Sequence, residues 1–266
     1  MKTGIYTDTA DIYHAEPHLG STSIKAMRVT AAHFNHVRTN GLVKTPAMFA
    51  GTVAHSGVID NDLSGYVVKP ADFDGRTKAG KEFMEANAGK PMITTEMYVD
   101  TKAMRAVLET YGEAMRLIEG AKIETSVYVI DPVSGQPVKA RPDIWKPGII
   151  ADYKTTKSIA GFERDIFNLG YEIQAGVYSI VTELVTGIPI TEFRWIAQER
   201  TGPYAVQVFR LSRQDLESAK VDARILINQC AVAIETNHFP GYEDRVKEVT
   251  RPAYRTSEIL SFEEAV

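Results

Sequence analysis

The stretch VKARPDIWKPGIIADYKTT, residues 138–156, decides the fold. Two segments that read as strands, 138–145 and 149–155, flank Lys146-Pro147-Gly148. Proline and glycine mark a turn, so the two segments predict the arms of an antiparallel β-hairpin. A one-residue change of register would move every side chain to the other face, so the position of the turn determines which side chains lie opposite one another.

Folding this hairpin about the midpoint between residues 147 and 148 places Asp143 opposite Asp152. Directly opposed residues of an antiparallel pair have Cβ atoms roughly 4.5–5.5 Å apart. Lys154 follows Asp152 by two positions and projects from the same face, whereas Ala151 and Tyr153 point the other way, into packing. Two carboxylates at that distance repel each other strongly unless a cation lies between them.

Two aspartates and a lysine on one surface suit the hydrolysis of phosphodiester bonds. Mg²⁺ prefers carboxylate oxygens and water, and when bound it lowers the pKa of a water molecule and orients it for in-line attack. A lysine can position that nucleophile or stabilise the charge that develops on the phosphate. The alternative is a surface hairpin with a cross-strand salt bridge. A second acid-x-Lys triplet, Asp100-Thr101-Lys102, lies in a predicted helix, where residues two apart do not share a face.

The rest of the chain predicts a mixed α/β domain in which helices pack against a central sheet. The first twenty residues indicate an arm or a short extended piece, and polar residues 69–91 a mobile segment with one short helix. Predicted helices cover about 24–38 (capped by Ser21 or Ser23), 46–58, a segment capped by Thr95, 162–185 and 213–236; predicted strands cover 124–130, 138–145, 149–155, 191–198 and 204–210. We expect one domain, 1–266, with a mainly helical part (1–120), a catalytic α/β core (121–240) and a C-terminal tail (241–266).

Other side chains are expected near the hairpin. Glu124 opens the first strand and can either reach a metal or simply mark the junction with the preceding helix. Tyr171, Gln174 and Tyr178 are spaced at i, i+3 and i+7 and share one stripe of a helix, either as packing residues with polar tips or as groups that line the site. His55 lies in the sequence GTVAH among small and apolar residues, where a structural histidine is more common than a metal ligand.

The composition of the 266 residues, 44% hydrophobic and 24% charged, is ordinary for a soluble globular protein. The net charge of −4 argues mildly against a nucleic-acid partner, but the residues that hold metal ions are themselves acidic. The single cysteine, Cys230, excludes an internal disulfide and a cysteine-held zinc or iron–sulfur site. No apolar run is long enough to span a bilayer and the N-terminus has no apolar signal core, so we expect a cytoplasmic protein.

The hairpin sequence resembles that of a known family. Arg141-Pro142-Asp143 followed by Asp152-Tyr153-Lys154-Thr155-Thr156 is similar to the PD-(D/E)XK core of the RecE-type exonucleases, which include exodeoxyribonuclease VIII and its phage relatives. The resemblance covers most of the chain and includes 21–25, 51–55 (the histidine motif of the RecB/RecE branch), 75–81 and 171–178. It implies an α/β fold with a PD-(D/E)XK (restriction-endonuclease-like) core, a central mixed sheet flanked by helices, and an N-terminal helical elaboration.

The resemblance also implies roles for individual residues. The implied catalytic residues are Lys154, Asp152, Asp143, Glu124, Gln174 and Tyr178, and the implied metal ligands are His55, Asp143, Asp152 and the backbone carbonyl of Tyr153. Within this set, Glu124 is a supporting acid, while Gln174 and Tyr178 organise the site. The iron–sulfur branch of these nucleases uses four cysteines and is excluded by the single cysteine of this chain.

These features together predict an Mg²⁺-dependent exodeoxyribonuclease, with Mn²⁺ as a substitute ion. The resemblance implies that it degrades linear double-stranded DNA in the 5′→3′ direction, forms ring-shaped homo-oligomers and works beside a single-strand annealing recombinase in phage-type recombination. The residues predicted to contact DNA are Lys25, Arg28, Arg76, Lys78, Arg141, Lys157 and Tyr171. The alternatives are an endonuclease or a nuclease of other polarity with this fold, and a non-catalytic DNA-binding or assembly module.

Overall fold

The computed structural model describes residues 1–251, so the predicted tail, 241–266, lies partly outside the described residues. At the centre is a five-stranded sheet in the order β10-β9-β8-β7-β4. Its strands are β4 (Lys122–Ile123), β7 (Ile144–Lys146), β8 (Ile149–Thr156), β9 (Glu192–Glu199) and β10 (Val206–Arg210). β8 and β9 run parallel and the other neighbours antiparallel, so the sheet is mixed, as predicted.

The hairpin forms with the predicted register. β7 and β8 are joined by a turn at residues 146–149, and Ile144 pairs with Ala151. Gly148 in this turn has a φ of 79°, a left-handed conformation that glycine adopts without steric penalty. The printed pairing ends at Ile144 and Ala151, so Asp143 and Asp152 each lie one residue beyond the last pair of the ladder. The register that predicts their opposition is confirmed for the three pairs of the hairpin itself.

The single strand predicted over 138–145 is wrong, because this stretch is divided between two sheets. β6 (Pro137–Ala140) joins a three-stranded sheet with β5 (Ser126–Ile130) and β1 (Gly4–Tyr6), whereas β7 belongs to the central sheet. Arg141-Pro142-Asp143 forms the corner between them. Pro142 has no N–H to donate to a strand ladder, which explains why regular pairing stops at this corner.

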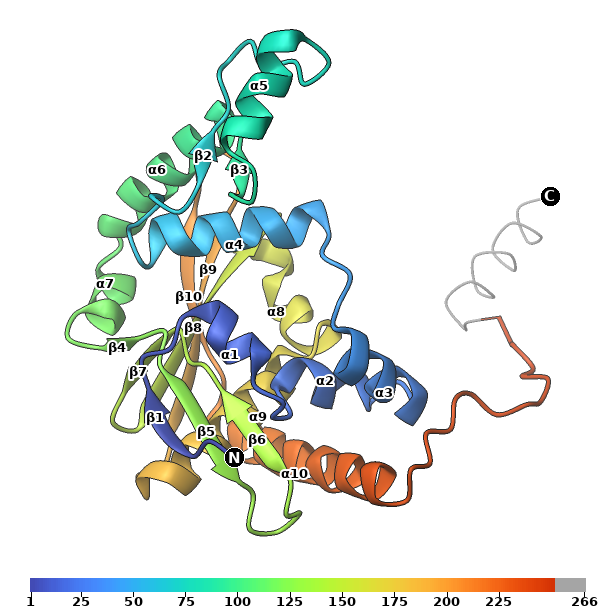
Figure 1. Ribbon diagram of the computed structural model, residues 1–266. Helices are drawn as coiled ribbons and strands as arrows, with labels where there is room; N and C mark the ends of the chain where they lie inside the picture. The colour runs from blue at the N-terminus through green and yellow to red at the C-terminus, as the bar shows by residue number, and fades with distance from the viewer. Residues whose placement is uncertain (252–266) are drawn as a thin grey trace, which may run out of the picture.

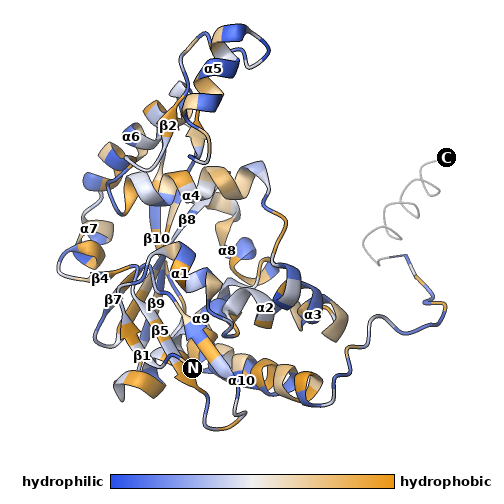
Figure 2. Ribbon diagram, in the orientation of Figure 1, coloured by the Kyte–Doolittle hydropathy of each residue, from blue (hydrophilic) through white to orange (hydrophobic). Residues whose placement is uncertain are grey.

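Helices cover both faces of the central sheet (Figure 1), which confirms the predicted α/β architecture. On one face, α4 (Pro46–Val58), α6 (Thr95–Glu109) and α7 (Gly112–Ile118) share an apolar core with Ala151 and Tyr153 of β8. On the other, α8 (Ile159–Asn168), α9 (Tyr171–Thr186) and α10 (Arg213–Glu235) pack with Ile150 and Trp195. Figure 2 shows hydrophobic and hydrophilic residues alternating along α10, as expected for a helix that buries one side.

Two of the predicted helices are interrupted. The helix predicted over 24–38 is divided into α2 (Ser21–Ala26) and α3 (Ala31–Asn40), and the Thr30 side chain caps α3. The helix predicted over 162–185 is divided into α8 and α9, because Gly170, with a φ of 67°, turns the chain between them. The helix predicted at 46–58 is confirmed as α4, and that at 213–236 as α10, whose first turn is capped by the Ser212 side chain.

The remaining elements lie at the periphery. The N-terminal piece contains β1 and α1 (Ala10–Ala15). The polar segment 69–91 contains the predicted short helix, α5 (Lys78–Ala86), and projects beyond the parallel pair β2 (Val67–Val68) and β3 (Met92–Ile93) (Figure 1). The cap of α6 is Thr94 rather than the predicted Thr95. Within residues 1–251, none of the helices combines the length and the apolar character that crossing a bilayer requires.

Candidate active site and metal centre

Asp152 and Lys154 lie on the same face of β8, as predicted. The Asp152 side chain is only 1% exposed, and its Oδ2 forms an ion pair with Lys154 Nζ. From α9, Gln174 Nε2 donates a hydrogen bond to Asp152 Oδ1 at 3.0 Å. Ala151 and Tyr153 are buried on the opposite face of the strand, in the core formed with α4 and α6. The two-residue period of the strand thus separates the polar group from the packing residues.

A second polar group adjoins the first and contains Asp143, His55 and Glu124. Asp143 Oδ2 accepts a hydrogen bond from Tyr153 N–H at 2.8 Å and lies 3.2 Å from His55 Nε2. Glu124 Oε1 lies 3.0 Å from the same nitrogen. Each of the three residues offers a potential ligand atom, and these atoms all lie within 4.8 Å of one another. Helix α4, the β4–β5 connection and the corner before β7 therefore converge on one point.

The donor atoms of this group fit a divalent cation. His55 Nε2 is buried between two carboxylates but is aligned for a hydrogen bond with neither. Asp152 Oδ2 is also buried and makes no hydrogen bond, although it is ion-paired with Lys154. Carboxylate oxygens are the ligands that Mg²⁺ and Mn²⁺ prefer. A cation among these atoms would engage the nitrogen and offset the mutual repulsion of the carboxylates.

The set of candidate metal ligands differs in one respect from that expected from the sequence. The hairpin sequence predicted a cation bound between Asp143 and Asp152. Among the described residues, the atoms close enough to share an ion belong instead to His55, Glu124 and Asp143, while Asp152 is held by Lys154 and Gln174. Sequence spacing alone is compatible with either a structural or a metal-binding role for His55 and for Glu124. Tertiary packing brings both to the candidate metal cluster.

The buried charges shift one another's pKa values. Burial and the nearby Asp143 raise the pKa of Asp152 to about 6, although Lys154 acts in the opposite direction. Burial also opposes ionisation of Asp143, but His55, Lys154 and the Tyr153 N–H together outweigh it and lower the pKa of Asp143. For His55, burial opposes protonation, yet Asp143, Asp60 and Glu124 raise its pKa well above the ordinary value. In the metal-free protein, protonated His55 therefore balances the carboxylates beside it.

Metal binding is accordingly expected to release a proton from His55, because an imidazole ligand must be neutral. The affinity for Mn²⁺ should rise by up to about tenfold for each pH unit while one proton is displaced. Isothermal titration calorimetry in buffers of different ionisation enthalpy measures the protons released. His55→Ala should bind Mn²⁺ more weakly and release fewer protons, and an affinity independent of pH in the wild-type protein would contradict a ligand role for His55.

The predicted stripe on α9 faces the two polar groups. Tyr171 lies at the first turn of α9, and its ring centroid is 5.1 Å from Lys154 Nζ. Gln174, one turn further, contacts Asp152 directly. Tyr178 is buried, and burial together with Asp152 and Asp143 raises its pKa. These three side chains thus surround Asp152 and Lys154 from the helical side.

Most of the chain matches the model of a known family. A family model described as a PDDEXK-like domain of unknown function (DUF3799) matches residues 20–250. The chain belongs to this family. The matched range of the PDDEXK-like domain contains the hairpin, His55, Glu124 and Gln174, and therefore both polar groups. The predicted PD-(D/E)XK fold is confirmed by this match and by the mixed sheet between helical layers.

Two solved structures are similar to this PDDEXK-like domain. The "Putative exonuclease" from Eubacterium rectale has a TM-score of 0.62 at 13% sequence identity, over 95% of this chain and 98% of that chain, which indicates a shared fold. An alkaline exonuclease from Laribacter hongkongensis covers 69% of this chain and 94% of its own at 14% identity, with a TM-score of only 0.31. No curated protein shows significant sequence similarity.

Two of the predicted DNA contacts, Lys25 and Tyr171, lie close to the site of the PDDEXK-like domain. Lys25 on α2 has its Nζ 5.7 Å from the centroid of the Tyr171 ring, which also lies beside Lys154. Burial and the charge of Lys154 lower the pKa of Lys25 to about 8. Lys157 is exposed one residue after the end of β8. Lys25 and Tyr171 therefore lie beside Lys154, whereas Lys157 is placed only by its exposed position after the strand.

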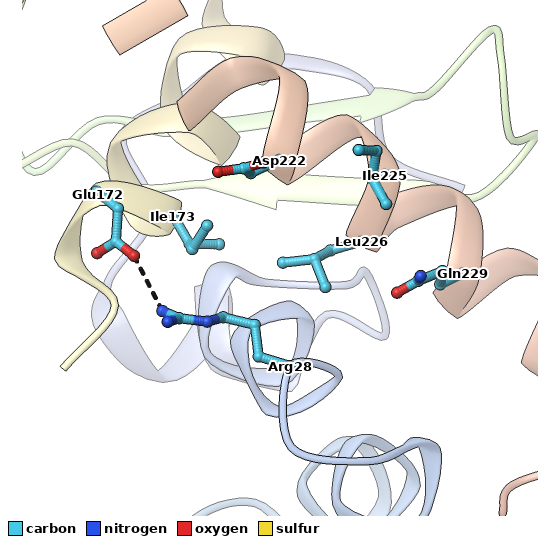
Figure 3. Close-up of a pocket in the computed structure, with 7 residues that line it drawn as sticks. All are labelled: Arg28, Glu172, Ile173, Asp222, Ile225, Leu226 and Gln229. Atoms are coloured by element: carbon cyan, nitrogen blue, oxygen red, sulfur yellow. Dashed lines mark hydrogen bonds and ion pairs between the residues drawn. The ribbon is translucent and has the colours of Figure 1, made fainter. Parts of the chain in front are cut away.

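Arg28 lies further away, at a separate cavity. Its Nη1 donates to Glu172 Oε1 at 2.9 Å, and the pair borders a cavity of about 280 Å³ between α9 and α10 (Figure 3). The other lining residues are Ile173, Asp222, Ile225, Leu226 and Gln229. This cavity contains none of the catalytic candidates. Arg28 therefore lies beside the acidic Glu172 rather than among the predicted metal ligands.

The other predicted DNA contacts fall into two environments. Arg76 and Lys78 project from the α5 region with side chains 92% exposed, and each pairs with a nearby acid, Asp74 or Glu82. Arg141 is different, because its side chain is only 12% exposed and its guanidinium donates to Glu124 and to the backbone carbonyl of Asp8. These bonds direct Arg141 into the protein, so the expectation of a direct DNA contact is corrected here.

Sequence reasoning missed Asp60 as a neighbour of the site. Its Oδ2 lies 3.9 Å from His55 Nδ1, on the side of the ring opposite the metal cluster. An acid on this side of the ring favours the protonated imidazole, and it raises the pKa of His55 together with Asp143 and Glu124. Asp60 follows the end of α4 by two residues, where the helical period no longer predicts which side chains meet.

Proposed function

We propose that this protein is a divalent-metal-dependent nuclease that hydrolyses phosphodiester bonds of DNA. The proposal rests on one observation above all: His55, Glu124 and Asp143 offer ligand atoms within 4.8 Å of one another, directly beside the Asp152–Lys154 pair. Membership of a PDDEXK-like family is consistent with this chemistry. The name of the similar Eubacterium rectale protein, "Putative exonuclease", points in the same direction.

In this proposal His55, Glu124 and Asp143 hold a metal ion, and Asp152 and the Tyr153 carbonyl contribute from the hairpin. The ion supplies an activated water and Lewis-acid stabilisation of the phosphate. Lys154 carries a positive charge at the site, because Asp152 and Asp143 raise its pKa despite burial. It is therefore placed to stabilise negative charge on the phosphate. Gln174 holds the Asp152 carboxylate in place through its 3.0 Å hydrogen bond.

The finer assignment follows the RecE-type resemblance. We infer a 5′→3′ exonuclease on linear double-stranded DNA, with Mg²⁺ as the ion and Mn²⁺ as a substitute. Its setting would be phage-type recombination, as a homo-oligomeric ring beside a single-strand annealing recombinase. Phosphate contacts near the site would come from Lys25, Lys157 and Tyr171, and more distant ones from Arg28, Arg76 and Lys78.

Cleavage of three DNA substrates tests this assignment. With Mg²⁺, linear duplex labelled at the 5′ end is expected to release labelled mononucleotides at once, whereas duplex labelled at the 3′ end should shorten progressively and keep its label until late. Closed circular DNA should remain intact, and EDTA should stop all cleavage. Nicking of the circle would instead indicate an endonuclease, and early loss of the 3′ label the opposite polarity. DNA binding that persists in EDTA, without any Mg²⁺-dependent or Mn²⁺-dependent cleavage, would indicate a binding module.

A further inference from the structure

The N-terminal arm, residues 1–16, contributes the edge strand β1 to the three-stranded sheet β1-β5-β6. β1 pairs with β5, with Gly4 opposite Tyr128 and Tyr6 opposite Ser126. The Tyr128 hydroxyl also donates to Asp8 Oδ2 at 2.7 Å, and the same carboxylate pairs with Lys2 at 2.7 Å. The arm is therefore held to the sheet by both backbone pairing and side-chain bonds.

Two basic residues, on β6 and at the corner that follows it, hold the arm through its main chain. Lys139 Nζ, on β6, donates to the carbonyl oxygens of Tyr13 at 2.7 Å and Glu16 at 2.6 Å. Arg141 Nη1, at the corner after β6, donates to the carbonyl oxygen of Asp8 at 2.7 Å. Because the acceptors are backbone atoms, these bonds define the path of the arm whatever its side chains are.

Arg141 connects the arm to the metal centre. Its Nη1 also donates to Ser126 Oγ at 2.9 Å, and its Nε donates to Glu124 Oε2. The other oxygen of that carboxylate, Oε1, is the one that lies 3.0 Å from His55 Nε2. One guanidinium thus binds one oxygen of Glu124 and leaves the second directed toward the candidate metal.

The backbone conformation of Glu124 is unusual, so the position of its side chain depends on the residues that hold it, Arg141 among them. Glu124 has a φ of 48°, a left-handed conformation that is unfavourable for a residue with a side chain and persists only where the surroundings determine it. Its N–H donates to the Asp143 carbonyl at 3.0 Å, which ties two candidate ligands together. The Arg141 bond is a further constraint on the same residue. Loss of this bond would leave the carboxylate free to rotate away from the cluster.

We propose that Arg141 is a positioning residue that couples the N-terminal arm to the metal centre. In this role it orients Glu124 as a ligand while its bond to the Asp8 carbonyl depends on the arm being in place. The inference rests on the proposed function only in that the His55–Glu124–Asp143 cluster binds a metal ion. It assigns Arg141 to the metal centre rather than to the DNA surface.

Calorimetry with Mn²⁺ on the full-length Arg141→Gln variant tests the proposal. Removing a hydrogen bond that supports a metal ligand typically weakens metal binding by about tenfold to 100-fold. We expect the Mn²⁺ affinity of Arg141→Gln to fall below that of the wild type within this range. Hydrogen exchange should also become faster in the arm. The matched control is Arg224→Gln on α10, which breaks another bond to a carboxylate, Asp131 Oδ2 at 2.6 Å, away from the cluster. This variant should keep the wild-type Mn²⁺ affinity. Arg141→Lys keeps the positive charge but lacks the several N–H donors of the guanidinium. Its Mn²⁺ affinity should lie between those of the wild type and Arg141→Gln.

Tyr128→Phe provides a milder test that keeps Arg141 intact. It removes only the hydrogen bond to the Asp8 carboxylate. Faster exchange in the arm together with weaker Mn²⁺ binding would support the coupling. A loosened arm with unchanged Mn²⁺ affinity would overturn it, as would Arg141→Gln with wild-type affinity or an equal loss in Arg224→Gln. If the wild-type protein binds Mn²⁺ but cleaves no DNA, the nuclease proposal fails while the coupling stands.

Discussion

Asp152→Asn is expected to abolish DNA cleavage, lowering the single-turnover rate on bound duplex by at least about 10³-fold. The substitution removes the charge that faces Lys154 while keeping the size of the side chain. Stability should not fall, because burial and the nearby Asp143 disfavour the ionised form of Asp152 and raise its pKa, and asparagine carries no charge in the same place. The rate and the melting temperature are measured on the same preparation.

The control for Asp152→Asn is Asp100→Asn. Asp100 belongs to the other acid-x-Lys triplet of the chain, lies on α6 and accepts a hydrogen bond from the Tyr204 hydroxyl at 2.6 Å. Its replacement should leave cleavage unchanged. If Asp152→Asn retains more than about a tenth of the wild-type rate, the proposed catalytic role of Asp152 is lost.

Lys154→Ala is the second change with a large expected effect. Because Lys154 is assigned to charge stabilisation in the chemical step, turnover on bound DNA should fall by about 10²- to 10³-fold while the Kd for DNA changes little. The matched control is Lys157→Ala, three residues further along and exposed. Loss of a phosphate contact there should weaken DNA binding and reduce the slope of log K against log salt by about one, with turnover retained.

The comparison of turnover with affinity separates the two possible roles of Lys154. Rapid-quench measurement on preformed complexes gives the chemical step, and fluorescence anisotropy in Ca²⁺ gives affinity without cleavage. Reduced affinity with full turnover on bound DNA would make Lys154 a phosphate contact rather than a catalytic residue.

The elements predicted correctly are those that depend on neighbouring residues. The β7–β8 register follows from Lys146-Pro147-Gly148, because a turn and a two-residue period together determine which residues face each other. The common face of Asp152 and Lys154 has the same origin. The spacing of Tyr171, Gln174 and Tyr178 likewise predicted one stripe on α9.

The elements predicted wrongly depend on tertiary contacts. Nothing local in 24–38 required a break, yet Thr30 begins a new helix that packs on α10. The corner at Arg141-Pro142-Asp143 divides one expected strand between two sheets. Periodicity reports which side of an element is apolar, but not where the element must bend to fit its neighbours.

The sequence by itself determined the register of the hairpin and the common face of Asp152 and Lys154, because strand geometry relates residues only a few positions apart. Only the tertiary structure decided that His55 and Glu124 form the cluster of ligand atoms with Asp143, and that Arg141 bonds inward. The partners of a buried charge are selected by desolvation and by the packing of distant segments, and neither is encoded in local spacing.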